Sequence, residues 1–142
     1  MTDDVSISKR LKQLDIGVGH LVIREGGTDL LPFSQTIVLL FLDDRRHSET
    51  TIGQIEDHLK VSNPTASGLV KRLLAKDLVI VTVADDDKRR RLVSITEKGR
   101  AAVCTADANI ARVDECLFQG FSEDDKVQLL RLLDKLSSNA LK

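Results

Sequence analysis

The strongest constraint on the fold of this chain is a pair of short amphipathic segments, residues 52–59 and 63–74, separated by a three-residue turn. Thr51 can cap the first segment as a helix, and Gln54 at the third helical position completes a capping box. Apolar residues then recur at helical spacing in both segments. Two helices joined by so short a turn are typical of a helix-turn-helix unit.

The second of these helices has one apolar face and one polar face. Either Ser62 or Asn63 can cap it, and Pro64 suits its first turn. The apolar stripe predicted to be buried consists of Ala66, Leu69, Val70, Leu73 and Leu74. The polar face carries Asn63, Thr65, Ser67, Gly68, Lys71 and Arg72. Small hydrogen-bonding side chains can read base edges in a DNA major groove, and the two cations can contact phosphates or guanine. An ordinary solvated face would not need the mid-helix glycine, which is unfavourable by about 1 kcal/mol relative to alanine.

Two β-prone runs, residues 78–83 and 92–95, predict a hairpin after the second helix. The tip between them has three acidic residues followed by four basic ones, residues 85–91. Such a charge run is often merely solvated. The alternative is that an arginine of the tip enters a DNA minor groove, where negative potential is focused. In that interpretation Asp87 can orient the guanidinium of Arg89.

These segments together resemble the MarR family of bacterial transcription regulators. The resemblance is carried by Ser62–Leu73 of the second helix, Asp87-Lys88-Arg89 of the tip, and Val93–Arg100 with its Ile95-Thr96-Glu97-Lys98-Gly99 run. The resemblance implies an obligate homodimer of winged helices on a pseudo-palindromic operator, often released by a small ligand or an oxidant. The chain departs from the family pattern at three positions: Lys88 replaces an arginine, and Asp77 and Lys60 replace glycines. Lysine lacks the bidentate fork of arginine, so Arg89 is the residue expected to enter the minor groove.

The sequence therefore predicts a mainly α fold with a small β-hairpin wing, and double-stranded DNA as its partner. The predicted DNA-binding residues are Ser62, Asn63, Thr65, Ser67, Gly68, Lys71, Arg72, Lys88, Arg89 and Arg90. An alternative of a different class is a winged helix that binds a protein. Steep weakening of binding with added salt would separate the two, because phosphate contacts release counterions.

Charge distribution also favours a nucleic-acid partner. The whole chain of 142 residues has a net charge of −1, with 42% hydrophobic and 30% charged residues. Residues 60–100 nevertheless contain ten Lys and Arg against five Asp and Glu, so this stretch is at +5 and the remainder at −6. This distribution is expected for a protein with a basic DNA-binding region and a separate, acidic dimerisation region.

The flanking segments predict helices that hold two copies of the chain together. One helix is predicted for residues 5–24, with a seam of Ile7, Leu11, Leu14, Val18 and Leu21, and another after Pro32, with Phe33, Ile37, Leu40 and Phe41 facing inward. A long helix from Thr96 to about Phe118 and a leucine-rich helix capped by Ser122 and Asp125 complete the chain. So much apolar surface on the last helix predicts a homodimer interface. The expected organisation is residues 1–30 and 97–142 for dimerisation and residues 31–96 for the winged helix-turn-helix.

Other functional classes find little support. His20, His47 and His58 are scattered without a nucleophile pattern, and there is no phosphate loop or dinucleotide fingerprint, so an enzyme is not expected. No Cys/His spacing suits zinc, and neither a metal nor a cofactor is predicted. The chain has no apolar run of membrane-spanning length and no signal-peptide core, which predicts a cytoplasmic protein without a membrane partner.

The signal that the protein senses is the most open question. The resemblance implies a ligand pocket where the first and fifth helices meet the reading unit, and His20, Arg24 and Phe41 are the candidate effector residues there. The alternative is that His20 and Arg24 are plain surface and Phe41 is core. In a redox alternative, Cys104 or Cys116 is oxidised, although the Ala- and Val-rich neighbours of Cys104 predict burial.

Overall fold

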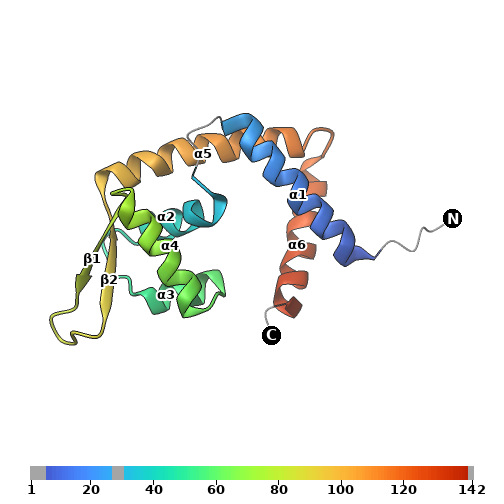
Figure 1. Cartoon of the computed structure of the whole chain (residues 1–142). Coiled ribbons are helices and arrows are strands. Elements are labelled where there is room, and N and C mark those ends of the chain that lie inside the picture. Colours follow the sequence, from blue (N-terminus) through green and yellow to red (C-terminus); the bar gives the residue numbers. More distant parts are fainter. Residues whose placement is uncertain (1–5, 27–30, 141–142) are drawn as a thin grey trace. The chain divides into compact units, whose positions relative to one another are not determined.

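The computed structural model describes residues 6–26 and 31–140, which fall into two compact units. One unit contains the described residues 6–26 and 108–140, and the other contains residues 31–107. Over the described residues the elements are α1 (Ile7–Gly26), α2 (Phe33–Asp44), α3 (Ile52–Leu59), α4 (Asn63–Ala75), β1 (Val79–Val83), β2 (Arg91–Ile95), α5 (Glu97–Leu117) and α6 (Glu123–Ala140) (Figure 1). The predicted class, mainly α with one small β-hairpin, is confirmed.

The helix-turn-helix forms as its caps predict. Thr51 Oγ1 accepts the backbone N–H of Gln54 at 3.2 Å, and the Gln54 side chain accepts the backbone N–H of Thr51 at 2.9 Å. Of the two residues that can cap α4, Ser62 is the one that does so, accepting the backbone N–H of Thr65 at 3.4 Å. The turn is possible because Lys60 adopts a left-handed conformation, with φ 56°.

The core of the second unit lies between α2, α3, α4 and the hairpin. Its largest fully buried side chains are Leu39, Leu42, Ile55, Leu73, Val38, Val79 and Val93. Two of the apolar residues predicted to face the core are exposed. Phe33, in the first turn of α2, is 53% exposed, because the buried face of this helix is formed by Val38, Leu39 and Leu42. Leu74 is 43% exposed, because Leu73 beside it takes the inward position on α4.

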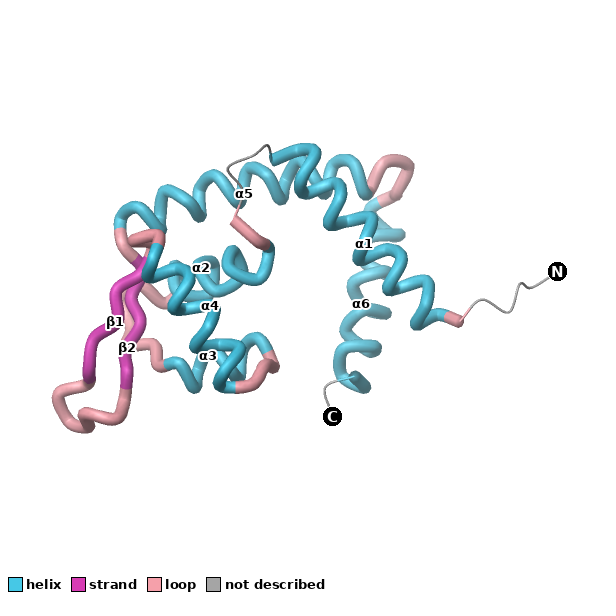
Figure 2. Tube along the Cα trace, viewed as in Figure 1, coloured by secondary structure: helices cyan, strands magenta, loops and turns pink. Residues whose placement is uncertain are grey.

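The β1–β2 hairpin is antiparallel, with Val79 opposite Ile95 and Val83 opposite Arg91 (Figure 2). Its inner strand is tied to the segment that precedes α3. The backbone N–H of Val93 donates to Thr50 O at 2.8 Å, and Thr51 forms an isolated bridge with Leu92. These backbone contacts attach the hairpin to the start of α3.

Close packing where α5 begins explains the glycine of the Ile95–Gly99 run. A Cβ on Gly99 would lie 2.2 Å from Leu78 O and 2.7 Å from Ile95 Cγ1. Only glycine allows α5 to start this close to the backbone of Leu78, the residue before β1. Asp77, in the turn between α4 and β1, has φ 60°. Glycine adopts this conformation without strain, and other residues rarely adopt it.

In the unit formed by residues 6–26 and 108–140, α6 begins with the predicted cap pair. Ser122 Oγ accepts the backbone N–H of Asp125, and Asp125 Oδ2 accepts that of Ser122, both at 3.0 Å. Apolar side chains of α1 and α6 remain exposed in the single chain: Ile7, Leu11, Leu14, Ile16 and Ile23 on α1, and Val127, Leu130, Leu132, Leu133 and Leu136 on α6. On α1, only Val18 and Leu21 of the predicted seam are half-buried.

Candidate nucleic-acid interface

The polar face of α4 is held in a defined arrangement at its N-terminal end. Ser62 Oγ and Thr65 Oγ1 form a hydrogen bond of 3.0 Å, so the capping residue also holds the Thr65 hydroxyl. Asn63 Nδ2 donates to Glu56 Oε1 of α3, and Ser67 Oγ donates to Asn63 Oδ1 at 3.4 Å. The side chains that could read a base are therefore oriented by contacts within the protein.

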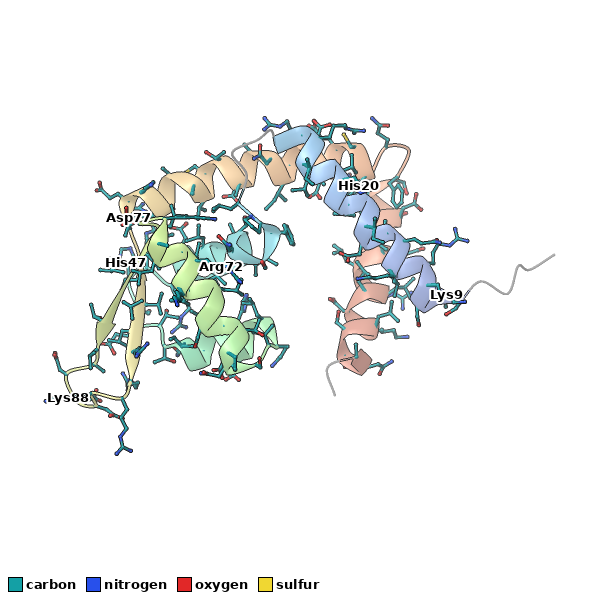
Figure 3. All side chains as sticks on the ribbon, in the orientation of Figure 1. Lys9, His20, His47, Arg72, Asp77 and Lys88 are labelled. Carbon is teal, nitrogen blue, oxygen red and sulfur yellow. The ribbon has the colours of Figure 1, made fainter. Side chains whose placement is uncertain are left out.

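Gly68 leaves open space on this face. A Cβ built at Gly68 would meet nothing nearer than Arg72 Nη1 at 3.9 Å. The protein itself therefore has no steric need for glycine at this position. Lys71 and Arg72 are exposed in the following turn of α4. Arg72 is labelled on this helix in Figure 3.

The cations of the hairpin tip differ in their partners. Arg90 Nη2 lies 3.2 Å from Glu49 Oε2 and Arg90 Nη1 lies 3.7 Å from Asp86 Oδ2, whereas Lys88, Arg89 and Arg91 form no ion pair with any residue that the structure describes. Lys88 lies at the tip of the hairpin (Figure 3). The suggestion that Asp87 orients the Arg89 guanidinium is wrong: Asp87 Oδ1 accepts the backbone N–H of Arg89 at 2.9 Å and so shapes the turn.

A groove of about 430 Å³ joins these elements. Its lining residues come from the start of α3, from α4 and from the hairpin: Thr51, Ile52, Gly53, Asn63, Ser67, Arg89, Arg90 and Arg91. Four of the predicted DNA-binding residues are thus brought together, namely Asn63, Ser67, Arg89 and Arg90. The other six lie outside its lining: Ser62, Thr65, Gly68, Lys71, Arg72 and Lys88.

Sequence reasoning missed the contribution of α3 and Arg91 to this groove. Thr51 was identified only as a cap, and the bridge between Thr51 and Leu92 that brings α3 beside the hairpin has no local signal. The capping box occupies the backbone N–H groups of Thr51 and Gln54. The N–H groups of Ile52 and Gly53, at the N-terminus of α3, are left to donate to a partner outside the protein. A helix N-terminus beside Arg89 and Arg91, which form no ion pair with a described residue, makes the groove electropositive.

The candidate effector residues belong to different units. His20 and Arg24 lie on α1, where His20 is exposed and Arg24 Nε is 3.2 Å from Glu25 Oε1. Phe41 lies on α2, and its ring stacks on that of His58 with centroids 4.1 Å apart. The Arg45 guanidinium carbon lies 5.6 Å from the centroid of the same ring.

Both cysteines are free thiols, but their surroundings differ. Cys104 is exposed, contrary to the predicted burial, because the inward positions of α5 are taken by Val103 and Ala102. It lines a pocket of about 270 Å³ with Arg100 and Asp43. Cys116 is half-buried, with Sγ 3.9 Å from Arg24 Nη2 and 3.8 Å from Glu25 Oε1.

Among residues 6–26 and 31–140, no three His, Cys, Asp or Glu side chains gather as metal ligands would. None of the helices described is both long and apolar enough to cross a membrane.

A short-turn pair of helices followed by a basic hairpin defines a winged helix-turn-helix protein. Residues 31–90 match the model of the MarR family. Over this stretch the chain is similar to the MarR family of transcription regulators. Its relatives of known class are regulators and not enzymes.

Known proteins resemble both the sequence and the fold. An HTH-type transcriptional regulator of Staphylococcus aureus (strain Mu50) is 23% identical over 106 residues, 73% of each chain. The repressor NicR of Pseudomonas putida is 26% identical over 92 residues, covering 65% of this chain and 58% of NicR. The S. aureus MepR–DNA complex shares the fold with a TM-score of 0.87, at 20% identity, over 96% of this chain and 99% of MepR. Bordetella bronchiseptica BpsR, whose DNA binding is regulated by 6-hydroxynicotinic acid, gives 0.85 at 22% identity over 96% of each chain.

Proposed function

We propose that this regulator binds a pseudo-palindromic DNA operator as a homodimer and represses transcription from it. The observation that carries the proposal is the electropositive groove, in which the hairpin arginines, the start of α3 and the N-terminal side chains of α4 converge. Phosphate contacts dominate affinity for DNA, and base contacts select the site. The groove and the polar face of α4 supply both kinds of group.

In this proposal α4 enters the major groove and Arg89 enters the neighbouring minor groove. Arg89 suits that role because its guanidinium has no ion-pair partner among the described residues, in contrast to Arg90. Narrow minor grooves attract arginine through their focused negative potential. Lys71, Arg72, Lys88 and Arg91 would contact phosphates.

Exposed apolar side chains support the proposed homodimer. Val127 is 64% and Leu130 is 62% exposed on α6, and Ile7 and Leu14 are also exposed on α1. Apolar surface of this extent is usually covered by a partner. Gly17 and Gly19 leave room on α1 for a partner to approach, since a Cβ at either position would meet nothing within 4 Å. A dimer would present two α4 helices to half-sites about 34 Å apart.

Selection of binding sites from random DNA duplexes tests the proposal. It predicts enrichment of a sequence with two-fold symmetry, loss of affinity in Ser67→Ala and Lys71→Ala, and little change in Thr105→Ala on the exposed face of α5. Enrichment of no sequence, or unchanged affinity in both α4 variants, would contradict it.

Release by a small molecule is the proposed mode of regulation. It draws on BpsR, whose DNA binding responds to 6-hydroxynicotinic acid, and on the predicted residues His20, Arg24 and Phe41. His20 and Arg24 have exposed side chains that can meet a ligand, whereas the Phe41 ring already contacts His58 and Arg45. A compound screen for release of the selected duplex, repeated with His20→Ala and Arg24→Ala, tests this mode: variants that respond like the wild type would exclude these two residues.

Oxidation is a second candidate signal because Cys104 is exposed and shares a pocket with Arg100. If this signal operates, peroxide abolishes DNA binding by the wild type and leaves Cys104→Ser bound. If peroxide abolishes DNA binding by Cys104→Ser as it does by the wild type, Cys104 is excluded as the sensor and Cys116→Ser is tested next.

A further inference from the structure

We propose that Glu56 is a positioning residue that makes Ser67 present a hydrogen-bond acceptor, so that α4 selects adenine or cytosine where Ser67 meets the DNA. This inference rests on the proposed function, because it takes α4 to be the helix in the major groove. It adds the chemical class of base that one position of the operator must hold, and it assigns a role to an α3 residue outside the predicted interface.

Three side chains form a relay from α3 to the reading face. Glu56, half-buried near the end of α3, accepts a hydrogen bond from Asn63 Nδ2. Asn63 is the first residue of α4, and its Oδ1 accepts a hydrogen bond from Ser67 Oγ at 3.4 Å. Asn63 and Ser67 both line the groove beside the hairpin arginines. Glu56 therefore acts on the groove through two other residues.

The direction of each hydrogen bond follows from the donor and acceptor inventory. An ionised carboxylate can only accept, so the amide of Asn63 must turn its NH₂ group toward Glu56. The amide oxygen then faces Ser67, and it can only accept as well. The single hydroxyl hydrogen of Ser67 is used by this bond, which leaves the lone pairs of Oγ for a partner outside the protein.

Bases differ in what they can give to such an acceptor. In the major groove, adenine N6 and cytosine N4 carry amino hydrogens, whereas guanine offers N7 and O6 and thymine offers O4, all of them acceptors. Ser67 held as an acceptor is matched by the first two bases and repelled by the lone pairs of the others. Serine is usually indifferent because its hydroxyl rotates; here the Glu56–Asn63 pair fixes it.

Glu56→Gln tests the relay because the two side chains are nearly the same size but glutamine has an NH₂ group. A glutamine can donate to Asn63 Oδ1, so that the Asn63 amide turns and its NH₂ group donates to Ser67 Oγ. The Ser67 hydrogen is then free to point at the DNA. The position that Ser67 contacts is identified first, as the one whose base preference is lost in Ser67→Ala. At that position Glu56→Gln should shift preference toward guanine or thymine, on the order of fivefold, which is what one neutral hydrogen bond contributes.

Two further variants make the test specific. Asp57→Asn removes the same charge from the neighbouring exposed position of α3, so it should alter overall affinity but leave base preference as in the wild type. Asn63→Ala removes the acceptor of the Ser67 hydrogen and should flatten the preference. If the wild type selects a symmetric operator but Glu56→Gln and Asn63→Ala keep its base frequencies, the relay is overturned and the proposed function stands. If the wild type selects no duplex, the proposed function itself fails.

Discussion

Gly68→Ala should make the folded protein more stable and its complex with DNA weaker. Alanine is favoured over glycine within a helix by about 1 kcal/mol, and Gly68 lies in the middle of α4. The added methyl group meets only Arg72 Nη1 at 3.9 Å, an ordinary van der Waals contact, so nothing in the protein opposes this gain. Thermal unfolding should therefore shift upward by roughly 2–4 °C.

The same methyl group points into the space where the DNA is proposed to lie. Inserting a methyl group into a close-packed contact costs about 1–3 kcal/mol, which corresponds to roughly five- to more than a hundredfold in the dissociation constant at about 1.4 kcal/mol per tenfold. Fluorescence anisotropy with a selected duplex measures this loss, and calorimetry measures the stability of the same samples.

Thr105→Ala is the matched control for stability alone. Thr105 is exposed on α5, and its Oγ1 only bonds back to Ala101 O at 3.3 Å, so alanine should stabilise that helix by about 0.5 kcal/mol without touching DNA. Unchanged DNA affinity in Gly68→Ala would refute the close approach of DNA to α4. A fall in its unfolding temperature would refute the open space described at this position.

Five other substitutions test separate parts of the account. Gly99→Ala should destabilise the fold by at least about 3 kcal/mol in denaturant titrations, because its Cβ would overlap the backbone 2.2 Å away; a stability equal to wild type would contradict this packing. Lys60→Gly should stabilise by about 1 kcal/mol by removing the left-handed penalty at φ 56°, and Asp77→Gly by less, since aspartate tolerates that region better; a loss of stability in either would be inconsistent with these dihedral angles. Lys88→Ala should lower DNA affinity and reduce the slope of log affinity against log salt by about 1, because one phosphate contact is lost, and an unchanged slope would place Lys88 away from the phosphates. Leu130→Asp should shift sedimentation at micromolar concentration from dimer to monomer without loss of helicity, and a persistent dimer would remove this face of α6 from the interface.

Much of the fold was predictable because its signals are local. The Thr51–Gln54 box, the Ser62 cap and the Ser122–Asp125 pair each involve residues three positions apart, and all three occur. The hairpin strands follow from runs of β-branched residues with a charged tip between them. Periodicity was less reliable on α2, where every residue from Ile37 to Leu42 is apolar and the sequence alone does not say which side faces the core.

The parts of the site that escaped prediction depend on contacts between distant residues. Arg90 was grouped with its neighbours as a DNA ligand, yet it pairs with Glu49, forty-one residues earlier in the chain. The contribution of α3 to the groove depends on the Thr51–Leu92 bridge. The exposure of Cys104 depends on how α5 is rotated when Gly99 packs on Leu78. Neither composition nor spacing carries this information.

The central claim is that two chains bind one DNA duplex. Each chain binds it with the polar face of α4 and with nearby cations that form no ion pair with a described residue. The measurement that tests this claim most directly is the affinity for a selected duplex as a function of salt, together with the number of chains bound. Four phosphate-contacting cations in each chain, Lys71, Arg72, Lys88 and Arg91, predict two chains per duplex and a slope of log affinity against log salt of about −7. A slope near zero, or one chain per duplex at saturation, would contradict the account.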